Sequence, residues 1–297
     1  MIASLPFAAL AEAVGPVDGV EVVVWDGSGE PPSDDIEFLV PDYRHATQTL
    51  GWFDRLTQVQ VVQTQTAGVD GLVELVPEGV VLANARGVHD DATAELALGL
   101  TIASLRGIDD AVREHGHWQP GRERRSLADS HVVVLGYGSI GRAVAERLLA
   151  CRAVVTAVAT AARDDDLVGR VVTSEDVDWA DQHVVVVVLP LTDTTRHVVD
   201  AAFLARLPDG ALVVNVGRGP LLDTDAVIAE AGRLRFALDV TDPEPLPDGH
   251  PLWSAPGVIV TSHIAGGTTA MLPRMAALLR DQLTAYVAGQ PLRNVVS

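Results

Sequence analysis

Short runs of β-branched apolar residues, ended by Gly, Pro, Asn or Asp, recur along the whole chain. They predict strands over Val22–Trp25, Ile36–Val40, Val59–Val62, Val80–Leu82, Val132–Leu135, Val154–Val158, Val184–Leu189, Leu212–Val216, Phe236–Val240 and Ile259–Thr261. Between many of them lie longer segments of helical period, such as Gly141–Leu149 and Ala201–Leu207. Strands that are apolar on both faces and alternate with helices are typical of parallel sheets covered on both sides. The predicted fold class is therefore α/β.

The chain has 297 residues, which is enough for two domains of ordinary size. The run Asp91–His115 predicts one long helix that bridges two lobes. A change of pattern at Ala265–Thr269 precedes a predicted helix over Met271–Ala288. We therefore expect a nucleotide-binding domain over residues 99–269, inserted into a second domain made of residues 1–98 and 270–297.

The composition excludes several classes of protein. All 21 basic residues are Arg and none is Lys, which excludes Schiff-base enzymes, pyridoxal-phosphate enzymes and Walker-type phosphate loops. Against 40 acidic residues they leave a net charge of 21 − 40 = −19, so we expect neither nucleic acid nor a membrane surface as a partner. The single cysteine, Cys151, fits a reducing cytoplasm. Neither a secretory signal nor a membrane span is predicted.

A glycine-rich turn follows the predicted strand Val132–Leu135 and leads into a predicted helix; its residues are Gly136, Tyr137, Gly138, Ser139, Ile140 and Gly141. In such a turn the first glycine permits the sharp bend, the second lets the backbone approach a pyrophosphate, and the third allows close packing of helix on strand. The helix N-terminus directs free N–H groups at the anion. The turn predicts dinucleotide binding, and an S-adenosylmethionine site is the main alternative.

The carboxylate that usually binds the ribose hydroxyls, about 20 residues after such a turn, is missing. The second predicted strand of the nucleotide domain runs into Ala159–Ala162 and Arg163, with acidic residues only at 164–166. Without a carboxylate at this position a 2′-phosphate is not repelled, and Arg163 could contact one. The coenzyme is left open between NAD and NADP, with a lean towards NADP.

Three polar residues follow predicted strands at the edge where open α/β sheets bind ligands. Arg218 lies between two glycines, and its planar guanidinium suits a carboxylate. His263 follows an apolar strand, and Glu244 lies in the rigid segment Asp-Pro-Glu-Pro. Each of them alone has an ordinary structural explanation. Together, an Arg that holds an acid, a His that exchanges a proton and a Glu that tunes the His predict a hydride-transfer site.

With these residues the chain resembles the D-isomer-specific 2-hydroxyacid dehydrogenase family over nearly its whole length. The resemblance is carried by TAGVDGL (66–72), the helix start at Ala94-Glu95, GYGSIG (136–141), LPLTDTTRH (189–197), NVGRGPLLD (215–223), ALDVTDPEPL (237–246) and VIVTSHIAGGT (258–268). It implies a Rossmann domain with a doubly wound parallel sheet, inserted into a smaller, flavodoxin-like substrate domain. It also implies a homodimer formed through the nucleotide domains.

The same resemblance implies roles for the site residues. Arg218 would anchor the substrate, His263 would act as acid and base, Glu244 would be its partner, and the backbone around Ala67 and Gly68 would hold the substrate carboxylate. The coenzyme is expected to contact Gly136, Gly138, Ser139, Ile140, Gly141, Leu189, Pro190, Val216, Gly217, Asp239 and Gly266.

The expected substrate is a small, unphosphorylated 2-keto or D-2-hydroxy acid such as glyoxylate, hydroxypyruvate or pyruvate. Members specific for phosphoglycerate place an Arg in the loop after the third predicted strand, where this chain has Thr64. Formate dehydrogenases of the same fold pair their His with Gln, and Glu244 argues against them. A phosphoglycerate dehydrogenase-like enzyme remains the alternative within the family.

Alternatives from other classes find less support. A non-catalytic NAD(H)-sensing protein of the same fold would not need Arg, Glu and His together. A hydrolase is not expected, because Ser139 lacks the first glycine of a nucleophile elbow. No metal site is predicted, since His115 and His117 form the only close His pair and a solvated segment explains them.

Overall fold

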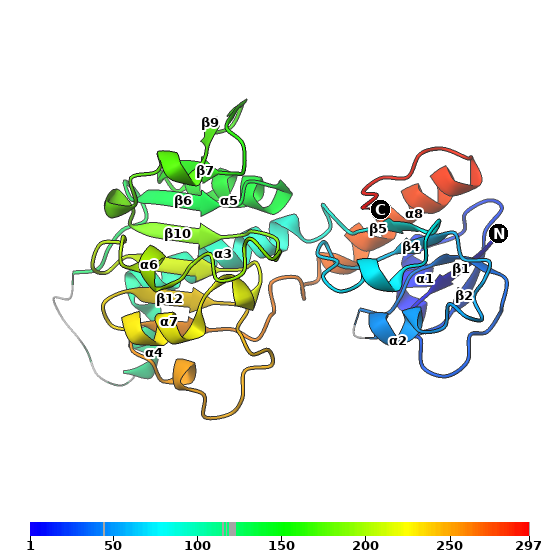
Figure 1. Cartoon of the computed structure of the whole chain (residues 1–297), viewed down its shortest axis with the longest axis horizontal. Coiled ribbons are helices and arrows are strands. Elements are labelled where there is room, and N and C mark those ends of the chain that lie inside the picture. Colours follow the sequence, from blue (N-terminus) through cyan, green and yellow to red (C-terminus); the bar gives the residue numbers. More distant parts are fainter. Residues whose placement is uncertain (44, 115, 117, 119–122, 297) are drawn as a thin grey trace. The chain divides into compact units, whose positions relative to one another are not determined.

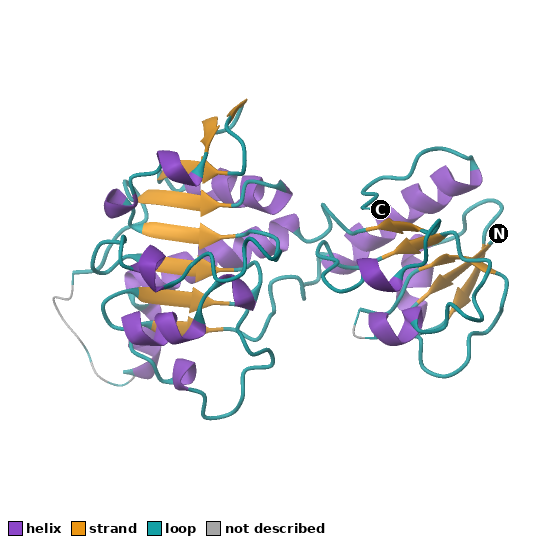
Figure 2. Ribbon diagram, viewed as in Figure 1, coloured by secondary structure: helices purple, strands orange, loops and turns teal. Residues whose placement is uncertain are grey.

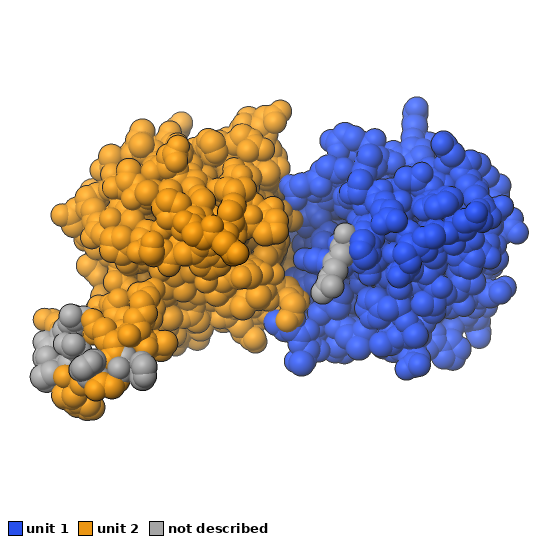
Figure 3. Space-filling view, turned by 90° about the horizontal axis from the view of Figure 1, so that it is seen from below, with its two compact units in different colours: residues 1–89, 268–297 blue, residues 90–267 orange. Residues whose placement is uncertain are grey.

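The computed structural model describes residues 1–43, 45–114, 116, 118 and 123–296. The chain divides into two compact units (Figure 3), unit 1 with residues 1–89 and 268–297 and unit 2 with residues 90–267. The first boundary lies nine residues before the expected one at 98/99, because the whole of helix α3 (Asp90–Arg106) belongs to unit 2. Its residues Ala94, Ala97 and Leu100 are buried in a core of that unit.

Unit 1 is built on a five-stranded sheet in the order β2-β1-β3-β4-β5, and every neighbouring pair is parallel. Its elements are β1 (Ile2–Leu5), α1 (Ala8–Val14), β2 (Glu21–Val24), β3 (Ile36–Leu39), α2 (Ala46–Leu50), β4 (Val61–Gln63), the 3₁₀ turn η1 (Val73–Leu75), β5 (Val81–Ala83) and α8 (Met271–Val287). The strand order is that of a flavodoxin-like doubly wound sheet. One face packs against α1 and α8, with Leu10, Phe38, Met275 and Leu279 in the core between them.

Unit 2 contains an eight-stranded sheet in the order β13-β12-β11-β10-β6-β7-β9-β8. Its strands are β6 (His131–Leu135), β7 (Val154–Val158), β8 (Arg163–Asp165), β9 (Gly169–Val172), β10 (Val184–Val187), β11 (Leu212–Asn215), β12 (Arg235–Leu238) and β13 (Val258–Val260). Only the pair β8–β9 is antiparallel. The helical elements are α3, α4 (Ile108–Arg113), α5 (Ser139–Ala150), η2 (Ser174–Asp176), η3 (Trp179–Asp181), α6 (Ala201–Leu204), η4 (Gly219–Leu221), α7 (Thr224–Glu230) and η5 (Pro251–Trp253).

Both faces of this sheet are covered by helices (Figures 1 and 2). Along β10, Val185 and Val187 face the core that includes α6 and α7, whereas Val184 and Val186 face the core that includes α3 and α5. The alternation explains why the run is apolar at every position: each residue is buried on one face or the other. The predicted α/β class, with a doubly wound parallel sheet, is confirmed.

Each of the ten predicted strands overlaps an observed strand, but β1, β8 and β9 were not predicted. The strand β1 has only one β-branched residue, and β8 and β9 are short and carry charges. The strand β8 pairs with its hairpin neighbour β9, which pairs in turn with β7, and β1 pairs with β2 and β3. These pairings do not need a continuous apolar run, so a local apolar pattern does not reveal them.

The prediction of one helix over Asp91–His115 is wrong. The segment forms two helices, α3 and α4, separated by Gly107, which has a φ of 61°. A residue in this left-handed conformation cannot continue an α-helix, and glycine adopts it at little cost. His115 lies outside the described residues, as does His117.

No helix in the described part of the chain is both long enough and apolar enough to cross a membrane.

Candidate functional site

The glycine-rich turn joins β6 to α5, and each of its glycines has a different surrounding. Gly136 has a φ of 106°, and a Cβ added to it would lie 2.7 Å from the Val188 carbonyl oxygen. A Cβ on Gly141 would lie 2.0 Å from the Gly136 oxygen, so α5 packs directly on the turn. A Cβ on Gly138 would meet nothing within 4 Å. The protein itself therefore needs glycine at 136 and 141, whereas at 138 the glycine leaves open space in front of the helix N-terminus.

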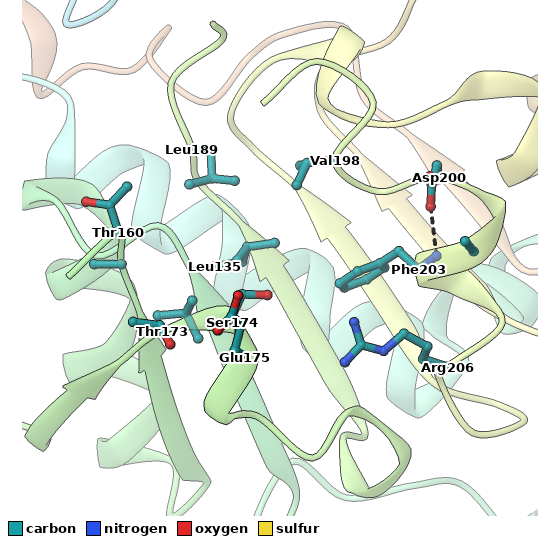
Figure 4. Close-up of a pocket in the computed structure, with 13 residues that line it drawn as sticks. Leu135, Thr160, Thr173, Ser174, Glu175, Leu189, Val198, Asp200, Phe203 and Arg206 are labelled. Atoms are coloured by element: carbon teal, nitrogen blue, oxygen red, sulfur yellow. Dashed lines mark hydrogen bonds between the residues drawn. The ribbon is translucent and has the colours of Figure 1, made fainter. Parts of the chain in front are cut away.

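A cavity of about 710 Å³ lies at the carboxyl edge of the same sheet (Figure 4). It is lined by residues that follow four neighbouring strands and by α6: Leu135, Val158, Ala159, Thr160, Thr173, Ser174, Glu175, Leu189, Val198, Asp200, Ala202, Phe203 and Arg206. Its walls are mostly apolar, with three hydroxyl side chains and three charged ones, Glu175, Asp200 and Arg206. Such a crevice beside a glycine-rich turn suits the adenosine half of a dinucleotide.

The predicted position of the ribose carboxylate carries none. Ala159 and Thr160 line the cavity at the end of β7, and the first charged side chain after them is Arg163. Its Nη2 donates a hydrogen bond to the Tyr137 carbonyl oxygen at 3.0 Å, and its guanidinium carbon lies 5.8 Å from the centre of the Tyr137 ring. The guanidinium is therefore held beside the glycine-rich turn.

Arg218 lies in the turn after β11, and that turn is shaped by Asn215. The buried Asn215 side chain donates to the Arg218 carbonyl oxygen at 2.8 Å and accepts from the Gly217 amide at 3.1 Å. A Cβ on Gly219 would lie 1.9 Å from the Thr241 carbonyl oxygen, so the turn also presses against the segment after β12. In the sequence Asn215 is only one residue of a motif, but in the structure its side-chain amide fixes the backbone that carries Arg218.

His263 and Glu244 form a close pair. The His263 Nδ1 and the Glu244 Oε1 are 2.5 Å apart, and the two side chains are 37% and 41% exposed. The hydrogen bond to Glu244 raises the pKa of the His263 imidazole, while burial acts in the opposite direction. The same hydrogen bond lowers the pKa of the Glu244 carboxyl. Arg218 is close enough for its charge to lower the pKa of both groups, so the structure brings all three predicted residues together.

The loop that carries His263 is organised by the carboxylate of Asp239, which is 1% exposed. One oxygen accepts from the Thr261 hydroxyl at 2.6 Å and the Ile264 amide at 2.9 Å, and the other accepts from the Ala265 amide at 3.0 Å. The His263 amide donates to the Asp239 carbonyl oxygen at 2.8 Å. These bonds hold His263 at a φ of 51°, which few residues other than glycine adopt.

In unit 1, the loop after β4 contains the predicted carboxylate-binding residues Ala67 and Gly68. Its shape is held from both sides, since the Thr64 hydroxyl donates to the Thr66 carbonyl oxygen at 2.9 Å and the Asn84 amide group donates to the Ala67 carbonyl oxygen at 2.8 Å. Within the described chain, no hydrogen bond from the Ala67 or Gly68 amide is seen. Both amides are thus available to an acceptor.

The other predicted coenzyme residues lie on unit 2. Ser139 and Ile140 form the first turn of α5, Leu189 lines the cavity, and Pro190 follows it with its carbonyl oxygen accepting from the Thr195 hydroxyl at 2.7 Å. Val216 and Gly217 belong to the turn that carries Arg218, and Gly266 follows the segment bound by Asp239. No group of three or more His, Cys, Asp or Glu side chains that could hold a metal occurs among the described residues.

Comparisons with known proteins agree with this geometry. Residues 98–265 match a family model described as "D-isomer specific 2-hydroxyacid dehydrogenase, NAD binding domain". This chain belongs to that family. It is 30% identical to a glyoxylate reductase of Thermofilum pendens, over 80% of this chain and 74% of the relative. It is 32% identical to glyoxylate/hydroxypyruvate reductase B of Pectobacterium atrosepticum, over 78% of this chain and 75% of the relative.

A solved structure also resembles this dehydrogenase over its full length. It is a D-isomer specific 2-hydroxyacid dehydrogenase of Xanthobacter autotrophicus Py2 in complex with NADPH, with a TM-score of 0.82 and 29% identity. The alignment covers 100% of this chain and 97% of that one. The family and the class of reaction predicted from the motifs are confirmed: the protein is an NAD(P)-dependent 2-hydroxyacid dehydrogenase. The match to an NAD-binding domain also decides against S-adenosylmethionine.

Two glycines of the turn allow coenzyme binding to be tested separately from stability: Gly138 has room for a Cβ, whereas Gly141 does not. Gly141→Ala is expected to destabilise the fold by about 1–3 kcal/mol, because its Cβ overlaps the Gly136 oxygen. Gly138→Ala should leave stability nearly unchanged but weaken coenzyme binding at least about tenfold, since it fills the space in front of the helix N-terminus. Urea unfolding and coenzyme titration measure the two effects. Equal stability losses in both variants would contradict this assignment.

The pair His263–Glu244 predicts a pH dependence. Reduction needs a protonated His263, and the raised pKa keeps the imidazole charged below that pKa and releases the proton as pH rises through it. Glu244→Gln keeps the shape but removes the charge, so the alkaline limb of kcat/KM for reduction should move to lower pH, with a smaller loss at acid pH. Asp248→Asn is the matched control, because it removes an exposed carboxylate from the same segment. Superimposable profiles for wild type and Glu244→Gln would show that Glu244 does not act on His263.

Proposed function

We propose that this dehydrogenase reduces a small, unphosphorylated 2-keto acid, such as glyoxylate or hydroxypyruvate, to the D-2-hydroxy acid. The observation that carries the proposal is the 2.5 Å pair of His263 and Glu244 beside Arg218. This arrangement supplies a proton donor and a cation on one edge of the sheet that also carries the coenzyme cavity. Reduction of a keto acid requires a proton donor for the carbonyl oxygen and a cation for the substrate carboxylate, and the arrangement contains both.

In the proposed mechanism, Arg218 binds the substrate through its carboxylate and carbonyl oxygens, and its positive charge stabilises the negative charge that develops on the carbonyl oxygen. The amides of Ala67 and Gly68 are proposed as further ligands of the carboxylate. The bound nicotinamide coenzyme supplies the hydride. His263 gives its proton to the forming alkoxide, and Glu244 stabilises the imidazolium until that transfer. In the reverse direction the neutral His263 accepts the hydroxyl proton.

The substrate class is supported by the loop after β4. Residues 64–70 contain no basic side chain, and Thr64 is 2% exposed with its hydroxyl engaged by the Thr66 carbonyl oxygen. This loop therefore offers no cation to a substrate phosphate. The names of two relatives point to the same class: a glyoxylate reductase in Thermofilum pendens and a glyoxylate/hydroxypyruvate reductase in Pectobacterium atrosepticum.

We further propose that NADPH is preferred to NADH. At the end of β7 no carboxylate is present to repel a 2′-phosphate, and Arg163 is held beside the glycine-rich turn with a charge that would attract one. The related structure from Xanthobacter autotrophicus, which contains NADPH, supports this preference. Glu175 lines the cavity, so the 2′-phosphate is expected away from this carboxylate, towards Arg163.

A panel of keto acids with each coenzyme tests the proposal. Glyoxylate, hydroxypyruvate, pyruvate and the phosphorylated analogue of hydroxypyruvate are reduced in separate assays with NADPH and with NADH. We expect the unphosphorylated two- and three-carbon acids to have the highest kcat/KM, with NADPH ahead of NADH. A preference for the phosphorylated acid would contradict the substrate class, and oxidation of neither coenzyme would favour a sensor of the same fold.

The same assay with Arg218→Lys tests the site. The variant keeps the charge but loses the two-pronged contact, so kcat/KM should fall more than about a hundredfold, or roughly 2.7 kcal/mol. Arg196→Lys is the matched control, because Arg196 is an exposed arginine of the same unit. A variant at position 218 with nearly wild-type activity would remove Arg218 from the mechanism.

We propose that the dehydrogenase is a cytoplasmic homodimer that associates through unit 2. Helix α4 exposes Ile108 and Val112, one turn apart, at 48% and 68%, and Trp118 after it is 93% exposed. Apolar side chains this exposed on one segment are typical of an interface. Sedimentation should give the mass of two chains for wild type and of one chain for Ile108→Asp combined with Val112→Asp. A monomeric wild type would refute the dimer.

A further inference from the structure

A hairpin at the edge of the unit 2 sheet contacts the glycine-rich turn. It is formed by β8 and β9, which pair antiparallel with Asp165 opposite Gly169, and β9 in turn extends the sheet beside β7 (Figure 1). The Tyr137 hydroxyl donates to Asp165 Oδ1 at 2.9 Å across a separation of 28 residues. Neither strand of the hairpin was predicted from the sequence, and the proposed function uses no residue of it except Arg163.

Three contacts join the hairpin to the turn and to α5. Besides the Tyr137 hydroxyl, the Arg142 guanidinium donates to both Asp165 oxygens at 3.1 and 2.9 Å and to Asp166 at 3.0 Å. In the opposite direction, Arg163 donates to the Tyr137 carbonyl oxygen at 3.0 Å. Tyr137 is itself 7% exposed, and burial together with the bond to Asp165 raises its pKa to about 12, so the hydroxyl stays a donor at any ordinary pH.

The residues that contact Asp165 flank the N-terminus of α5. Tyr137 directly precedes Gly138, and Arg142 lies in the first turn of α5, so Asp165 is bonded to the chain on both sides of Gly138 and Ser139. These two residues form the helix N-terminus that faces the open space described above. Asp165 is fixed in turn by its own hairpin, whose Leu167 and Val168 amides donate to it at 3.0 and 3.2 Å.

We propose that the β8–β9 hairpin clamps the glycine-rich turn in its coenzyme-binding shape, with Asp165 and Tyr137 as positioning residues for the pyrophosphate. A free turn with three glycines has many conformations, and binding would have to order it. The clamp fixes the turn from its outer side before the coenzyme arrives. Its loss should therefore appear in coenzyme affinity, while the site around His263 is left unchanged. The inference concerns coenzyme binding and does not depend on which keto acid is reduced.

The negative charge of Asp165 opposes coenzyme binding, so its effect has to be measured separately from the effect of the clamp. A carboxylate near the helix N-terminus repels a pyrophosphate, and Arg142, which pairs with both Asp165 and Asp166, offsets part of this negative charge. Tyr137→Phe removes the hydrogen bond without changing any charge. Asp164→Asn removes one negative charge from the same strand, at an exposed residue for which the described chain shows no ion pair. The variants Asp165→Asn and Asp164→Asn therefore carry the same net charge, but only Asp165→Asn changes the residue that contacts Tyr137 and Arg142.

The experiment measures the dissociation constants of NADPH and of ADP-ribose, a probe with pyrophosphate but no nicotinamide, for wild type and the three variants. We expect Tyr137→Phe and Asp165→Asn to weaken both ligands about tenfold, the size of one hydrogen bond to a charged group, and Asp164→Asn to leave them within about twofold. The double variant Tyr137→Phe/Asp165→Asn should lose little beyond the larger single effect, because both remove the same contact. KM for the keto acid and the pH profile of reduction should not move.

Several results would overturn the clamp. Unchanged ligand affinities in Tyr137→Phe, with or without a lower melting temperature, would mean that the hairpin only supports the fold. Equal effects of Asp164→Asn and Asp165→Asn would assign the effect to charge. If Asp165→Asn fails to fold, Tyr137→Phe still decides, since a phenylalanine fills the same space and removes only the hydroxyl.

Discussion

The parallel pairing of β10, β11, β12 and β13 is the constraint on which the site depends. In a parallel sheet all strands end at the same edge, so the residues that follow successive strands are brought into one row. Leu189 follows β10, Arg218 follows β11, Asp239 follows β12 and His263 follows β13. Residues separated by up to 74 positions are thereby brought to one edge.

A position at the sheet edge does not by itself orient a side chain. In the turns that carry Arg218 and His263, buried polar side chains fix the backbone. The Asn215 amide holds the backbone around Arg218, and the Asp239 carboxylate holds the loop of His263 through three donors. Both polar side chains are almost fully buried, which costs free energy unless every polar atom is bonded. Here that condition is met by backbone amides and a carbonyl oxygen of the turns, together with the Thr261 hydroxyl. The reactive groups can therefore remain partly exposed to a substrate while their backbones are rigid.

The glycine-rich turn of unit 2 is also fixed by contacts within the protein. Gly136 and Gly141 are required by close contacts within the protein, whereas Gly138 is not. A local motif can state that three glycines occur, but the contacts distinguish the two that build the turn from the one that leaves room for a ligand. The turn is also tied to a hairpin from the far edge of the sheet, through Tyr137 and Asp165. Substrate and coenzyme thus meet residues whose geometry is set before either binds.

The sequence by itself determined the α/β class, ten of the strands and the family, and it singled out Arg218, Glu244 and His263 as candidate site residues, because each of these leaves a local signal. A strand buried on both faces is apolar at every position, and a turn that must bend sharply carries glycine. Only the tertiary structure decided the strands β1, β8 and β9, the break at Gly107, and the contacts of Asn215, Asp239 and Asp165. The break had a glycine as its signal, but one glycine inside a helical pattern is often tolerated. The contacts of Asn215 are local, but no apolar or glycine pattern marks them. Most of the other features depend on partners that only folding brings near: β9 pairs with β7, the Asp239 carboxylate binds the loop of His263, and Asp165 binds Tyr137 and Arg142.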